Sequence, residues 1–152
     1  MTIAELTGRV AQWMRDFGQD VPDTITHPER NTQLMRWRLI REENNELAEA
    51  TTDAERLDAI ADLIVVVVGA AADLGIKPKT LEAHLADVLK ANDAKRWTVE
   101  ETANTPHDWV VSAVPWSGLY AVRDQTGKIR KPPGWTAPDP QRHIDAQRRG
   151  EG

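Results

Sequence analysis

Apolar residues in the first 96 positions recur at intervals of three and four residues, the period of one face of an α-helix. The first such series is Ile3, Leu6, Val10, Trp13, Met14 and Phe17. The pattern predicts four helices, which end near Gly18, Ala50, Leu74 and Arg96. Residues 19–30 contain two prolines and are predicted to form a loop, and Thr80 is the expected N-cap of the fourth helix.

The third helix has an apolar centre. Residues 63–72 form the longest apolar run of the chain, and its four consecutive valines, residues 65–68, are also compatible with a buried strand. The flanking segments are rich in alanine and other strong helix formers, which favours a helix from about Ala54 to Leu74. The run is half of the roughly 20 residues that a membrane-spanning helix needs, so no span is predicted.

The rest of the chain, from Trp97 onward, differs in character, because it holds six of the nine prolines. Residues 118–131 predict a short hairpin that turns at residues 124–127, and the chain from Pro132 onward is predicted to be an irregular tail. We therefore expect residues 1–96 to form a helical core. Residues 97–152 are expected to add a Trp- and Pro-rich insertion, the hairpin and the tail to the same domain.

Composition narrows the possible functions. The chain has 152 residues and no cysteine, which excludes disulfides, thiolate nucleophiles and cysteine-ligated metal sites. The net charge of −5 falls entirely within residues 1–96, so nonspecific binding to nucleic acid is not expected. Residues 1–20 lack the features of a signal peptide, which predicts a cytoplasmic protein with no membrane partner.

Carboxylates occur where apolar side chains would be expected. Glu42, Glu43 and Glu46 are helical neighbours, and Glu43 falls on the apolar stripe of the second helix. In the third helix, Asp58 and Asp62 are four residues apart, and Asp62 directly precedes the apolar run. A buried carboxylate is costly unless it is paired or bound to a metal.

These two helices are joined by a short connection, so antiparallel packing would bring both acidic groups together. Several converging carboxylates suit Mg²⁺ or Mn²⁺, which prefer oxygen ligands. The alternative is that the acids form solvated faces, balanced by Arg38, Arg41 and Arg56. That alternative does not explain acidic residues on two apolar stripes.

The end of the fourth helix carries Asn92 and Lys95 three residues apart, on one face. An amide and an ammonium near a metal cluster are suited to a polyphosphate, because the ammonium offsets the charge that the metals leave. Alternatively, this segment is a frayed basic helix end that interacts with the helix dipole.

Residues 36–47 (RWRLIREENNEL), 58–62 (DAIAD) and 91–95 (ANDAK) resemble the MazG-like, all-α nucleoside triphosphate pyrophosphatase superfamily. Residues 124–131 (DQTGKIRK), 134–135 (GW) and 137–139 (APD) are similar to the C-terminal segment of its phosphoribosyl-ATP pyrophosphohydrolase-like and phage branches. The resemblance implies an all-α fold: a four-helix bundle that is completed by forming a homodimer or homotetramer. It also implies metal-dependent hydrolysis of a (d)NTP to a (d)NMP and pyrophosphate.

Site residues follow from the same resemblance. Glu43, Glu46 and Asp62 match positions that bind Mg²⁺ or Mn²⁺, with two or three ions per site, and Glu42 or Glu43 is the expected water-activating base. Where the family pattern has a Glu, this chain has Ala59, so Asp58 is the candidate substitute ligand. Expected substrate contacts are Asn92 and Lys95, together with Lys128 and Lys131 of the basic hairpin, where Trp135 could stack on a base.

Substrate identity is less well defined than the reaction. The branch that the chain resembles includes the MazZ type, which acts on dGTP in phages that replace adenine with 2-aminoadenine. We therefore expect dGTP or GTP first, and the host cytoplasm as the location if a phage encodes the protein. A noncatalytic helical oligomer that binds a nucleotide or a protein is the competing hypothesis. Neither a serine-hydrolase motif nor a phosphate-binding loop is present, and the histidines show no metal-binding spacing.

Overall fold

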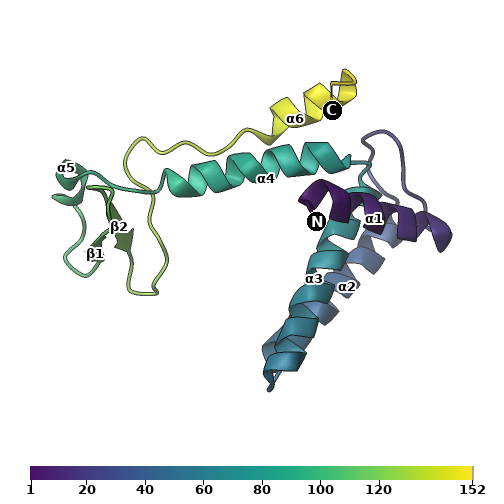
Figure 1. The fold of residues 1–152 in the computed structure, drawn as a ribbon, viewed down its shortest axis with the longest axis horizontal. Helices are drawn as coiled ribbons and strands as arrows, with labels where there is room; N and C mark the ends of the chain where they lie inside the picture. Colours follow the sequence, from purple (N-terminus) through teal and green to yellow (C-terminus); the bar gives the residue numbers. More distant parts are fainter. Residues whose placement is uncertain (152) are drawn as a thin grey trace. The chain divides into compact units, whose positions relative to one another are not determined.

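The computed structural model describes residues 1–151 and is mostly helical (Figure 1). Its helices are α1 (Ile3–Asp16), α2 (Arg30–Glu49), α3 (Asp53–Asp73), α4 (Pro78–Asp93), α5 (Val99–Thr102) and α6 (Pro140–Arg148). The strands are β1 (Val110–Ala113) and β2 (Tyr120–Arg123). The predicted all-α class is confirmed, and so are the first four helices, with ends within a few residues of those expected.

The chain divides into two compact units. The helical unit comprises residues 1–83 and the C-terminal segment from residue 140, and the hairpin unit comprises residues 84–139. Within the helical unit, α2 and α3 form an antiparallel pair and α1 packs against α3 (Figure 1). No described helix is by itself long and apolar enough to cross a membrane; by length and composition alone, only α3 and α4 qualify, as a bent pair.

Local sequence signals explain where α3 begins. The Thr52 side chain accepts a hydrogen bond from the Glu55 N–H, and the Glu55 carboxylate accepts one from the Thr52 N–H, which is a capping box. The four valines lie within this helix, so the strand alternative is wrong. Val68 and Ala72 form a buried core with three residues of α1: Val10, Ala11 and Met14.

Two expectations for the helical unit are wrong. Thr80 does not cap α4, because the helix begins at Pro78, a residue suited to the first helical turn; Thr80 is buried within that turn. The predicted irregular tail contains α6, whose Gln147 is buried. The Gln147 amide donates to the Gly75 carbonyl at 2.7 Å and accepts from the Lys77 N–H at 2.9 Å. These two hydrogen bonds attach α6 to the turn between α3 and α4, and they stabilise a helix of only nine residues.

In the hairpin unit, β1 pairs antiparallel with β2 in a register that places Val111 opposite Val122. The predicted hairpin is therefore only partly correct: β2 is its first strand, but the expected second strand contributes a single bridge, between Arg123 and Ile129. Trp97 is buried beside the sheet, and its indole N–H donates to the Arg130 carbonyl at 3.0 Å.

Candidate active site

Glu43 lies at the centre of the acidic residues on α2 and α3. Its side chain is partly buried, and its Oε2 atom is buried without a hydrogen-bond partner. Burial raises the pKa of the Glu43 carboxyl, and the nearby negative charges of Glu46, Asp62, Glu42 and Asp58 raise it further. The structure thus brings together the five acids that the antiparallel packing of the two helices predicted.

Among residues 1–151, these five carboxylates form no ion pair with a basic side chain, so the arrangement concentrates negative charge. In the part of the chain that the structure describes, no three of these carboxylates have oxygens within 4.8 Å of one another, a spacing that mutual repulsion favours. A partly buried carboxylate with an unsatisfied oxygen is stabilised by a proton or by a cation. Since all the surrounding groups are oxygen donors, a hard divalent cation suits them chemically.

An open pocket of about 340 Å³ adjoins this cluster at the turn between α2 and α3. Its walls carry four carboxylate residues, Glu46, Glu49, Glu55 and Asp58, together with Ala50, Thr51 and Ala59. Two of the five clustered acids, Glu46 and Asp58, therefore also face solvent-accessible space that a ligand can enter.

The solvated-face alternative accounts for only part of the site. Four of the five clustered acids, Glu42, Glu46, Asp58 and Asp62, are exposed, as that alternative requires, and Glu43 is the partly buried exception. Two of the arginines expected to balance the acids contact other groups, however. Arg56 pairs with Asp53 at 3.2 Å, and the Arg41 guanidinium lies 5.2 Å from the centre of the Trp37 ring. Among the described residues, neither Arg38 nor Arg41 forms an ion pair with the acidic cluster.

Ala59 is almost completely buried, at 3% exposure, whereas the preceding Asp58 is exposed. The two side chains leave α3 about 100° apart. Asp58 nevertheless lies close enough to Glu43 to raise the pKa of its carboxyl. Asp58 thus contributes charge to the cluster from a face different from that of residue 59.

The other predicted contact residues belong to the hairpin unit. The Lys95 ammonium donates to the Asn92 amide oxygen at 2.6 Å and lies 5.9 Å from the centre of the Trp135 ring. Lys131 is closer to the same ring, at 3.9 Å, and the Trp135 indole N–H donates to the Ala91 carbonyl. Lys128 is exposed, and within the described chain it does not lie over this ring. The structure therefore joins only three of these predicted groups around Trp135.

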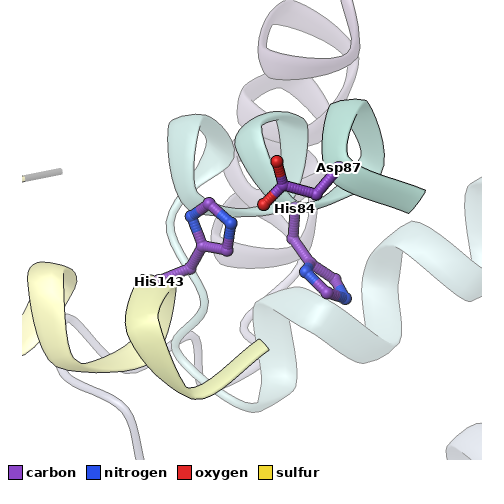
Figure 2. Close-up of side chains that lie close together, drawn as sticks. All are labelled: His84, Asp87 and His143. Atoms are coloured by element: carbon purple, nitrogen blue, oxygen red, sulfur yellow. The ribbon is translucent and has the colours of Figure 1, made fainter. Parts of the chain in front are cut away.

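The histidine analysis missed Asp87. His84 and Asp87 are three residues apart on α4 and project from the same helix, whereas His143 belongs to α6 (Figure 2). A shared helix face allows His84 and Asp87 to bind one ligand. Two ligands are fewer than a structural or catalytic zinc site uses, so within the hairpin unit this pair alone does not define a metal centre.

The phosphoribosyl-ATP pyrophosphohydrolase family matches residues 9–88, more than half of the chain. The chain belongs to this family. A search of curated proteins finds no match. The family is part of the MazG-like all-α superfamily, so the resemblance is confirmed. Membership implies divalent-metal-dependent pyrophosphohydrolase chemistry on a nucleotide triphosphate. The matched residues include all five clustered acids and end before Asn92.

Proposed function

We propose that the protein is a metal-dependent nucleoside triphosphate pyrophosphohydrolase that converts a (d)NTP and water to a (d)NMP and pyrophosphate. The observation that carries this proposal is the position of Glu43, which is partly buried, unsatisfied at Oε2 and surrounded by four carboxylates from two helices. We propose dGTP or GTP as the first substrates to test. We propose that the protein works in the cytoplasm, which is the host cytoplasm if a phage encodes it.

Glu43, Glu46 and Asp62, with Asp58, would hold two or three Mg²⁺ or Mn²⁺ ions. The residues fit such ions because the donor set consists of carboxylates and because one buried oxygen lacks a partner. When bound, the ions neutralise the phosphates and lower the pKa of an attacking water. The cation charge also relieves the repulsion that raises the pKa of Glu43.

A carboxylate of the cluster must accept the proton of that water. Glu43 and Glu42 are the candidates, and burial, the first cause of the raised pKa of Glu43 and one that the cations do not cancel by charge, favours a proton on that carboxyl. Glu42 is exposed to water. We therefore assign proton acceptance to an oxygen of the Glu43 carboxylate that does not bind a metal ion. Glu42 is the second candidate.

Asn92, Lys95, Lys128 and Lys131 are proposed to contact the nucleotide. Three of them offer an ammonium, a compact donor that suits phosphate oxygens. Among the described residues, none of these three lysines pairs with a carboxylate within salt-bridge distance, so their charge is available to an anion.

Assembly of two or four copies is the second part of the proposal. Along α3, four apolar side chains lie on one face and are 45–70% exposed: Leu57, Ile60, Ile64 and Val67. Asp58 and Asp62 point away from this face, since they are offset from its centre by roughly 140° and 180° around the helix. An exposed apolar row of this kind is typical of an interface, and a second copy would cover it without blocking the acids.

The competing proposal is a noncatalytic oligomer that binds a nucleotide or a protein partner. Assay of pyrophosphate release from the eight standard NTPs and dNTPs, with Mg²⁺, Mn²⁺ or EDTA, separates the two. Metal-dependent formation of a monophosphate and pyrophosphate supports the enzyme and identifies its base. Absence of turnover from a helical, oligomeric protein supports the binding protein.

A further inference from the structure

A second pocket of the helical unit lies between α1 and α3. Its volume is about 310 Å³, and it is lined by Met1, Leu6, Arg9, Val10, Trp13 and Val65. This volume is at the lower end of the roughly 300–1,000 Å³ range of small-molecule sites. The walls are largely apolar, with one half-exposed indole and one guanidinium.

The pocket adjoins the acidic cluster along α3. Val65 follows Asp58 by seven residues, which places the two side chains about 20° apart on the helix, and it follows Asp62 by three residues, or about 4.5 Å along the axis. The pocket wall and these two acids therefore share one face of α3. A ligand whose phosphates lie at the acids can extend one helical turn to place its remaining part between α1 and α3.

Trp13 and Arg9 define the chemistry of that remaining part. Trp13 is 50% exposed, so its ring is open to a flat partner, although it also packs against Phe17 at 5.1 Å between ring centres. Among the described residues, Arg9 forms no ion pair, and its guanidinium is free to donate to carbonyl or ring-nitrogen acceptors. An aromatic surface beside a fixed set of donors suits a planar heterocycle that carries acceptors on its edge.

A similar pocket, lined by residues of both α2 and α3, makes a useful comparison. It measures about 300 Å³ and includes Trp37, which is 54% exposed. Trp37 and Glu46 are nine residues apart on α2 and therefore point in opposite directions from the helix. The Trp37 ring therefore points away from Glu46, although two other walls of its pocket, Arg36 and Asp73, lie on the helix faces of Glu43 and Asp62, which makes Trp37 the rival stacking residue that the test must separate from Trp13.

We infer that the pocket between α1 and α3 binds the nucleobase of the substrate, with Trp13 stacking on the base and Arg9 donating to its edge. This inference rests on the proposed function and adds the subsite that recognises the base. Stacking is made equally in the ground state and the transition state, so it contributes to substrate affinity more than to the chemical step.

The test compares Trp13→Ala with Trp37→Ala in the pyrophosphate-release assay, using the nucleotide that the wild-type protein hydrolyses fastest. Base–aromatic stacking is worth about 1–3 kcal/mol, so Trp13→Ala should raise KM by about 5- to 150-fold while kcat changes less than threefold. Trp13→Phe should restore most of the affinity. Trp37→Ala has matched exposure and should leave KM within twofold.

Three results would overturn the inference: an unchanged KM in Trp13→Ala, an equal rise in Trp37→Ala, or a KM change that accompanies a loss of oligomeric state in sedimentation. If circular dichroism shows that Trp13→Ala does not fold, Arg9→Gln in the same pocket takes its place. It should also raise KM, and an unchanged KM in Arg9→Gln would overturn the inference. A wild-type protein that releases no pyrophosphate from any nucleotide overturns the proposed function itself, whereas an active protein with an unchanged Trp13→Ala affinity overturns only the base pocket.

Discussion

Arg36 of α2 and Asp73 of α3 form a buried, two-pronged ion pair. The Arg36 Nε donates to Asp73 Oδ2 at 2.7 Å, and Nη2 donates to Oδ1 at 3.2 Å, with the two side chains 9% and 4% exposed. Arg36 and Glu43 are seven residues apart on the same face of α2, as Asp73 and Asp62 are on the same face of α3. The pair therefore holds the two helices in the register that brings Glu43 close to Asp62.

Breaking this pair should destabilise the helical unit strongly. Arg36→Met leaves the Asp73 carboxylate buried without its partner, and the loss of one member of a buried pair typically costs about 3–5 kcal/mol. The free energy of unfolding in urea measures the effect. The double variant Arg36→Met/Asp73→Leu removes both charges and should recover much of the loss. A loss below about 1 kcal/mol in Arg36→Met would show that the pair does not hold the helices together.

Gly69 leaves room for the Arg36 guanidinium. A Cβ atom at this position would clash with Arg36 Nη1 and lie 2.9 Å from Cζ. We expect Gly69→Ala to lower the free energy of unfolding by about 1–3 kcal/mol through overpacking. Gly8→Ala on α1 is the control, because its Cβ would meet only Pro78 Cγ at 3.9 Å and the better helix propensity should raise stability by about 0.5–1 kcal/mol. Equal effects at the two glycines would contradict the account.

The capping residue Glu55 should make the stability of the fold depend on pH in the acidic range, between its ordinary pKa of 4.5 and its lowered value of about 2. Hydrogen bonds from the backbone N–H groups of Thr52 and Thr51 lower the pKa of Glu55 from 4.5 to about 2. A lowered pKa means that the ionised cap stabilises the fold above pH 4.5, and that this contribution is lost as the pH falls toward 2. The difference in Tm between the wild type and Glu55→Gln should therefore shrink between pH 5 and pH 3. A difference that stays constant over this interval would exclude the carboxylate as its source.

Asp58 should act through the charge of the cluster. Asp58→Asn removes one of the four charges that raise the pKa of Glu43, and so weakens the attraction of the site for a divalent cation. We expect a several-fold higher Mg²⁺ concentration for half-maximal activity. Asp53→Asn, five residues earlier on the same helix and with a fully exposed carboxylate, is the matched control. An identical Mg²⁺ dependence for both variants would remove Asp58 from the metal site.

Periodicity was sufficient to predict α1 to α4, because the spacing of apolar positions by three and four residues is a signal carried within each helix. The same reasoning located Glu43, whose place between Ile40 and Leu47 on an apolar stripe puts a carboxylate where burial is expected. The short α2–α3 turn then predicted which acids would meet. These signals are local, and each could be read from one helix and its immediate neighbour.

What could not be predicted depends on contacts between distant segments. Arg36 and Asp73 are 37 residues apart, and neither position has a periodic signal that distinguishes a buried ion pair from two exposed charges. Helix α6 forms where prolines suggested a tail, because Gln147 finds partners some 70 residues away. Similarly, β2 could pair with either flanking segment, and only the folded hairpin unit selects β1.

The central claim is that the carboxylates of α2 and α3 carry out metal-dependent hydrolysis. The most direct test is steady-state pyrophosphate release, with Mg²⁺ or Mn²⁺, by the wild type, Glu46→Gln and Asp62→Asn, with helical content monitored by circular dichroism. We predict that both variants keep their helices and lose at least about 100-fold in kcat, as expected when a group that acts in the reaction is removed. Turnover close to that of the wild type in both variants would contradict the claim.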